Sequence, residues 1–221
     1  MKRDQEGESY HNMLVDGGVY SSLLRAVIDG TLMGLVMGPN CRTRSVLRHY
    51  PLDVPGGGPK PLRTWQEPWG KDGLEKAERD KVREDDVMMW RGIFLFIVSE
   101  EVRKATIGKE ERRRMRIGIE QPADPKNYKP EVVSFWSTQE WRRLREMYGL
   151  EEQTFKQSVW QRRATKPTTF GGNLALKLPE EEIGFYVKKE PIKDSKMLSR
   201  WAPGIMKEVA MRIHTEILGP R

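Results

Sequence analysis

Two short apolar runs, each followed by a chemically reactive residue, decide the predicted fold: residues 35–41 read LVMGPNC and residues 115–122 read MRIGIEQP. Both runs have the length of a buried strand, and helical patterns lie between the predicted strands. Strands that alternate with helices form a parallel sheet in an α/β layer fold, and such sheets bind ligands outside the carboxyl ends of their strands. The sequence therefore predicts a mostly parallel sheet with Cys41 and Glu120 together at one rim.

The remaining sequence patterns predict the loops, helices and other strands of the fold. Residues 51–73 are rich in Pro, Gly and Trp without a period, which predicts a long inserted loop. Ser137 and Glu140 have the spacing of a capping box at the start of a helix. The expected helices cover 19–28, 74–105, 137–148 and 195–218, with a break at Pro203-Gly204, and the expected strands cover 32–37, 115–119, 154–157 and 168–176.

A length of 221 residues accommodates one domain with appendages. We expect a lead-in over 1–18, an α/β domain over 19–178 and a C-terminal helical segment over 179–221. A net charge of +7 and a pI near 9.5 favour a polyanionic partner, DNA or RNA. The longest apolar run, residues 93–98, is far below the roughly 20 residues that cross a bilayer, and the charged start has no apolar leader. We therefore expect an intracellular protein, nuclear or cytoplasmic, without a membrane partner.

The single cysteine, Cys41, lies between a strand-length apolar run and two arginines. Arg42 and Arg44 favour the thiolate, so the pattern predicts a thiol pKa below the ordinary value of about 8.5. The alternative is an unreactive loop cysteine. A cysteine hydrolase built on Cys41 and His49 would need an orienting third group, and the sequence marks none. The histidines lack metal-ligand spacing, so no metal site is predicted.

Charged clusters elsewhere admit two interpretations. Arginines interleaved with tryptophans grip phosphates and stack on bases, and the alternative is a solvated face beside core tryptophans. Asp85-Asp86 lies in a charge-rich helical stretch, where we expect a solvated helix face rather than cation ligands. The candidate nucleic-acid contacts are Arg42, Arg44, Arg142, Arg143, Gln161, Arg162 and Lys166, with Trp136, Trp141 and Trp160 among them.

Three segments, in this order, resemble motifs of the cytosine-5 DNA methyltransferases. Residues 38–45, GPNCRTRS, resemble the family's Gly-Pro-Pro-Cys-Gln-x-Phe-Ser loop. The EQP at 120–122 resembles its Glu-Asn-Val or Glu-Asn-Pro motif, and QRRAT at 161–165 resembles its Gln-x-Arg-x-Arg motif. The matching positions are Gly38, Pro39, Cys41, Ser45, Glu120, Gln161 and Arg163, while Asn40, Arg42, Arg44, Gln121 and Thr165 depart from the family.

The resemblance implies a Rossmann-like fold with S-adenosylmethionine as the methyl donor. It also implies three catalytic roles: Cys41 would attack C6 of a flipped cytosine, Glu120 would contact the base edge near N3, and Arg163 would steady the pocket. These residue types belong together because a pyrimidine becomes nucleophilic at C5 only after a thiolate adds at C6. The base must also leave the stack to meet the thiol.

A wider resemblance, over most of residues 20–204, is to a methyltransferase-like segment found inside retroelement polyproteins. The family binds its cofactor on a strand and Gly-x-Gly turn ahead of the cysteine loop, and the residues before Gly38 form neither. The resemblance thus implies a partial Rossmann-like domain, degenerate or truncated at its cofactor-binding half and inactive alone, with S-adenosylmethionine as cofactor only if active. The alternatives are a non-catalytic nucleic-acid-binding or assembly segment of the polyprotein, and an active methyltransferase completed by a partner chain.

Overall fold

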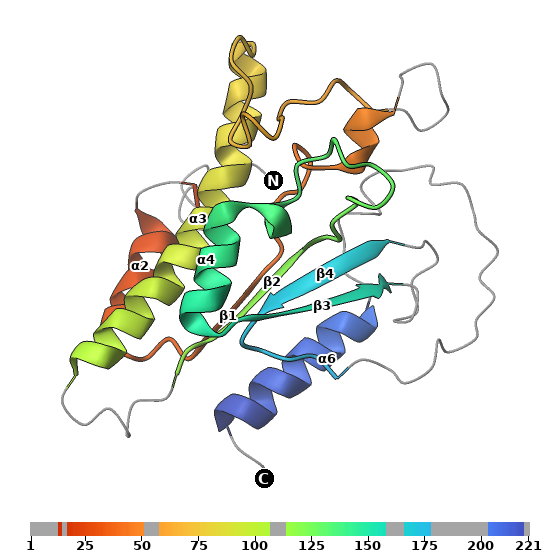
Figure 1. The fold of residues 1–221 in the computed structure, drawn as a ribbon. Helices are drawn as coiled ribbons and strands as arrows, with labels where there is room; N and C mark the ends of the chain where they lie inside the picture. Colours follow the sequence, from red (N-terminus) through yellow and green to blue (C-terminus); the bar gives the residue numbers. More distant parts are fainter. Residues whose placement is uncertain are drawn as a thin grey trace, which may run out of the picture.

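The structure is a computed structural model that describes residues 13–14, 17–50, 58–106, 114–157, 166–177 and 203–218. Its described strands form one four-stranded sheet in the order β1-β2-β4-β3 (Figure 1). Strands β1 and β2 are parallel, with Met37 opposite Ile119, and β4 is antiparallel to both β2 and β3. The strands are β1 (Gly34–Met37), β2 (Arg116–Pro122), β3 (Glu151–Lys156) and β4 (Pro167–Gly172).

The prediction of a mixed α/β fold is confirmed, but the prediction of a mostly parallel sheet is wrong. Only one of the three strand pairs is parallel. The reason is the connection over residues 157–166, which is too short for the helical crossover that returns a chain to a parallel strand. Strand β4 therefore runs against its neighbours. Because β2 and β3 both oppose β4, strands β1, β2 and β3 still point the same way.

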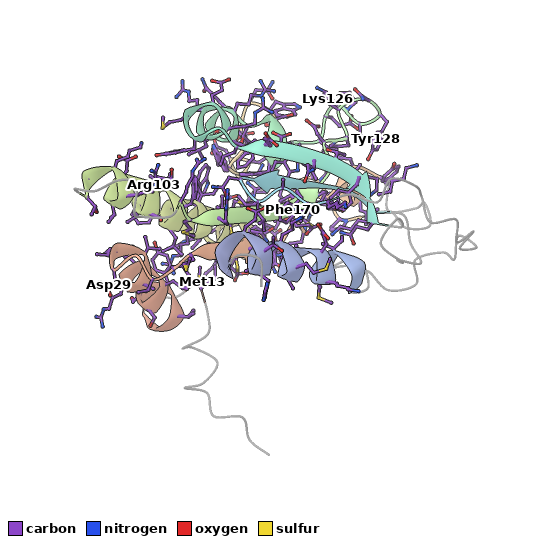
Figure 2. The ribbon with its side chains drawn as sticks, turned by 90° about the horizontal axis from the view of Figure 1, so that it is seen from below. Met13, Asp29, Arg103, Lys126, Tyr128 and Phe170 are labelled. Atoms are coloured by element: carbon purple, nitrogen blue, oxygen red, sulfur yellow. The ribbon has the colours of Figure 1, made fainter. Side chains whose placement is uncertain are left out.

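The helices lie on both sides of this sheet. Helices α3 (Lys76–Ala105) and α4 (Gln139–Tyr148) form the crossovers from β1 to β2 and from β2 to β3, and they contribute to one shared core. Helix α6 (Pro203–Ile213), which continues as a π-helical segment over His214–Leu218, lies on the opposite side from α4 (Figure 2). Helix α2 (Gly18–Ile28) packs on α3. Short 3-10 turns occupy Val46–His49 (η1) and Phe135–Ser137 (η2).

The core between the sheet, α3 and α4 is rich in aromatic rings. Trp136 and Trp141 meet edge to face with their centroids 5.1 Å apart, and Trp141 is fully buried. Gly171 of β4 lies directly under both rings, because a Cβ there would stand 2.4 Å from Trp136 Cζ3. The two tryptophans are thus core residues, as the alternative interpretation held. Other buried members of this core are Met89, Ile93, Phe96, Ile117, Ile119, Phe135, Tyr148 and Leu150.

A second buried cluster joins the other face of the sheet to α6. Phe155 and Phe170 from β3 and β4 pack with Ile205 and Val209 of α6. Removing these side chains from water stabilises the fold by about 1.5–3 kcal/mol for each large apolar group. The C-terminal helix therefore shares a core with the sheet.

Helix α4 begins differently from the sequence prediction. Ser137 lies in η2 rather than at the N-cap, and its hydroxyl donates to Asp124. The N-cap is Thr138, whose Oγ1 accepts from the backbone N–H of Trp141 at 3.4 Å. The 3-10 turn takes up the residues before Thr138, so the predicted capping box is wrong: the N-cap lies one residue later, and its N3 residue is Trp141 rather than an acid.

Most other predicted helices and strands within the described residues are confirmed to within a few residues. Of the predicted helix over 195–218, residues 195–202 lie outside the described residues, and Pro203 and Gly204, the predicted break, are the first two residues of α6. Described residues 58–73 of the expected inserted loop form neither helix nor strand.

Candidate functional site

A pocket of about 470 Å³ lies beyond the carboxyl ends of β1 and β2. We name it the Cys41 pocket. Cys41 reaches it from the loop after β1, Gln121 from the end of β2, and Lys166 from the start of β4. Tyr128 also lines it, from the outer loop that carries Lys126 as well (Figure 2). The remaining lining residues are Asn40, Arg42, Arg44, Ser45, Val46, Leu47, Arg48, Pro59, Pro122, Ala123, Pro125, Ser134, Phe135 and Pro167.

The structure brings Glu120 to the same rim as Cys41. Glu120 is buried, and its Oε1 accepts from Lys166 Nζ at 2.9 Å and from Gln157 Nε2 at 3.3 Å. The Glu120 carboxylate and the Lys166 ammonium are both close enough to Cys41 to act on its pKa. Cys41 and Glu120 come together because β1 and β2 are parallel and Met37 lies opposite Ile119. The residues that follow Met37 and Ile119 therefore leave the sheet at the same edge.

The Cys41 thiol is not activated in the way the sequence predicted. Cys41 is partly buried, and its removal from water raises the pKa of the thiol above its ordinary value. Lys166 lowers that pKa, whereas the carboxylates of Glu120 and Asp85 raise it. Burial has the largest effect, so the thiol stays protonated at neutral pH. The predicted lowering of the pKa by Arg42 and Arg44 is wrong.

Arg42 and Arg44 do not lower the pKa of the thiol because both arginines face carboxylates of α3. Arg42 forms ion pairs with Glu84 and with Asp85, where Nε and Oδ1 are 3.0 Å apart. Arg44 Nη2 is 3.3 Å from Asp86 Oδ1, and the Arg44 guanidinium lies 4.9 Å from the centre of the Trp69 ring. Burial lowers the pKa of Arg44 to about 10. The two guanidinium groups therefore fix the loop after β1 through the carboxylates of α3, and they do not stabilise a thiolate at Cys41.

The interpretation of Asp85-Asp86 as a solvated helix face is also wrong. Asp85 is only 3% exposed, and its Oδ2 accepts from the hydroxyl of Thr43 at 2.7 Å and from the Thr43 N–H at 3.1 Å. Arg63, 2% exposed, donates to Thr43 Oγ1 and to Asp86 Oδ2. A buried polar network therefore fixes the two residues after Cys41. Sequence reasoning missed Arg63, and no local signal marks it.

Two buried polar atoms of pocket-lining residues have no hydrogen-bond partner among the residues that the structure describes. Gln121 donates from Nε2 to the carbonyl of Pro39 at 2.6 Å, which leaves its Oε1 unpartnered. Arg44 Nη1 is likewise unpartnered. Buried polar groups normally form hydrogen bonds, so these two atoms are exceptions.

Among the other predicted nucleic-acid contacts that the structure describes, only Lys166 lines this pocket. Arg142 and Arg143 are exposed on α4 and do not line it. Lys166 lines it but is paired with Glu120. Gln161, Arg162 and Arg163, the last a predicted catalytic residue, lie outside the described residues.

Within the described ranges, no group of three His, Cys, Asp or Glu side chains is arranged to hold a metal ion. None of the described helices has the length and apolar character to cross a membrane. In the described part of the chain, β1 is an edge strand of the sheet, and no described strand with a Gly-x-Gly turn lies beside it. Comparison with protein-family models, curated proteins and solved structures finds no match to this chain.

Proposed function

We propose that this chain is a degenerate or truncated cytosine-5 DNA methyltransferase-like domain of a retroelement-derived polyprotein, inactive as a methyltransferase on its own. The observation that supports this best is that Cys41 and Glu120 lie at the same rim of the sheet, while burial raises the pKa of the Cys41 thiol. A site with the residues of a covalent base chemistry, but without an ionised nucleophile, fits a domain that has kept its architecture and lost its activity.

The chemistry of thiolate addition supports an inactive site. Addition to C6 of a pyrimidine needs a thiolate, and the raised pKa of Cys41 keeps that species scarce at neutral pH. Glu120 already accepts hydrogen bonds from Lys166 and Gln157. A base edge would have to displace one of these donors before it could reach the carboxylate.

The sheet supports a partial Rossmann-like fold as the finer description. Strands β1, β2 and β3 run in one direction and are joined through α3 and α4, which is the βαβ pattern of doubly wound sheets. S-adenosylmethionine would then serve as cofactor only where a partner chain supplies the missing strand and turn.

The second candidate function is a non-catalytic nucleic-acid-binding or assembly segment of the polyprotein. The observation in its favour is that Arg142 and Arg143 are exposed on α4, away from the Cys41 pocket, in a chain with a net charge of +7. Contacts of that kind bind phosphates without selecting a base.

Calorimetry and fluorescence anisotropy together test the proposal. The isolated chain should bind no S-adenosylmethionine at micromolar concentration, and micromolar binding would contradict the claim of an absent cofactor half. A labelled single strand with one cytosine should lose about tenfold in affinity on Glu120→Gln, the worth of one charge-assisted hydrogen bond. A strand without cytosine is the control. If Glu120→Gln changes neither affinity, Glu120 does not recognise the base, and the result favours the second candidate function.

A further inference from the structure

The Cys41 pocket has features that neither a methyl donor nor a nucleic-acid strand explains. Its surface is mostly apolar, with prolines, Leu47 and Phe135 among the lining residues. Four cations also line it, and none of the lining residues is a carboxylate. Ligand pockets commonly combine such an apolar body with a few convergent polar groups. The cations are Arg42, Arg44, Arg48 and Lys166.

Arg48 differs from the other three cations. Arg42, Arg44 and Lys166 each form an ion pair with a carboxylate, whereas Arg48 forms none with any described residue. Its guanidinium is nevertheless fixed, because Nε donates to the carbonyl of Arg42 at 2.5 Å and Nη1 donates to the carbonyl of Lys60 at 3.0 Å. An arginine held by neutral carbonyls has no ion pair that a ligand must displace, and its remaining N–H groups suit an anionic oxygen.

Two buried polar atoms of lining residues are unpartnered as well within the described part of the chain. Gln121, only 1% exposed, has an unpartnered acceptor, and Arg44, 8% exposed, has an unpartnered donor. Leaving such atoms unsatisfied costs about 1–3 kcal/mol each. Both atoms lie below the pocket surface, so a ligand would be recognised through Arg48 and the apolar lining.

We propose that the Cys41 pocket is a binding site for a small organic anion with an apolar body, whose anionic group is held by Arg48. This goes beyond the proposed function, because it requires neither nucleic acid nor a methyl donor. The apolar body lies against the proline and aromatic lining, and the charge complements the guanidinium of Arg48.

A matched pair of fluorescent probes tests this. The first is 8-anilino-1-naphthalenesulfonate, and the second is N-phenyl-1-naphthylamine, which has the same rings without the sulfonate. The sulfonate probe should bind the full chain one to one and more tightly than the neutral probe. Arg48→Met should weaken the sulfonate probe about tenfold and leave the neutral probe unchanged. Arg143→Met, the same loss of charge on α4, should change neither.

Equal binding of the two probes, or a sulfonate affinity that Arg48→Met does not change, would overturn the proposal. Because Arg48 also ties two loop segments together, its replacement could unfold the loop, so a second measurement uses the native chain. Saturating sulfonate probe should slow alkylation of Cys41 by iodoacetamide at pH 9 at least threefold, since the thiol lines the same pocket. Unslowed alkylation would also overturn the proposal. The readouts do not involve nucleic acid or S-adenosylmethionine, so this proposal and the proposed function can fail separately.

Discussion

The chain carries two pairs of arginines that look alike in sequence and behave oppositely in the structure. Arg42 and Arg44 follow the reactive cysteine, yet the carboxylates of α3 engage both of them. Arg142 and Arg143 follow a core tryptophan and remain exposed. The difference shows that a charge adjacent to a site in sequence is not thereby available to the site. What matters is which carboxylates the fold brings opposite it.

The largest expected effect is the loss of stability on replacing Arg44, a member of the first arginine pair. Arg44→Met should lower the free energy of unfolding by about 2 kcal/mol, because it removes one partner of a buried ion pair. The cost stays below that of a fully orphaned charge, since Asp86 keeps its ion pair with Arg63. Arg143→Met should change stability by less than about 0.5 kcal/mol. Urea unfolding of both variants measures the difference, and equal stabilities would remove the distinction between the two pairs.

A smaller effect concerns which cation acts on the thiol. Lys166 lowers the pKa of Cys41, so Lys166→Gln should raise that pKa and slow alkylation of Cys41 at pH 8. Arg143→Gln is the matched control and should leave the rate unchanged. Iodoacetamide kinetics followed by mass spectrometry give both rates. A faster rate in Lys166→Gln would mean that its ammonium does not favour the thiolate.

The smallest expected effect concerns the exposed pair. If Arg142 and Arg143 bind phosphates, replacing both by alanine should flatten the plot of log affinity against log salt by about 0.7–0.9 for each phosphate that is no longer neutralised. The expected change corresponds to about two phosphates or fewer, because exposed arginines engage phosphates only in part. Fluorescence anisotropy of a labelled DNA or RNA strand across a salt series measures the slope. An unchanged slope would show that these arginines only solubilise α4.

Much of the architecture follows from local patterns. Apolar periodicity marked α2, α3, β1 and β2 to within a few residues, and the βαβ order placed Cys41 and Glu120 at one rim. The direction of β4 was missed because strand periodicity carries no information about which way the chain returns. The length of the β3–β4 connection did carry that information.

The electrostatics of the site could not be predicted in the same way. Arg42 and Asp85 are 43 residues apart, and the polar network with Arg63 depends on how α3 lies against the cysteine loop. Sequence adjacency therefore assigned Arg42 and Arg44 to the thiol, whereas burial and distant carboxylates decide its pKa. The acidic pair on α3 was a signal of this network, but its partners were visible only in three dimensions.

The most direct test of the central claim, an assembled site with an unionised nucleophile, is the pKa of Cys41 in the native chain. It can be measured from the ultraviolet absorbance of the thiolate during a pH titration, with Cys41→Ser as the blank, because Cys41 is the only cysteine. The account predicts a pKa above the ordinary thiol value of about 8.5. A value at or below about 8.5 would show an activated nucleophile and would contradict the account.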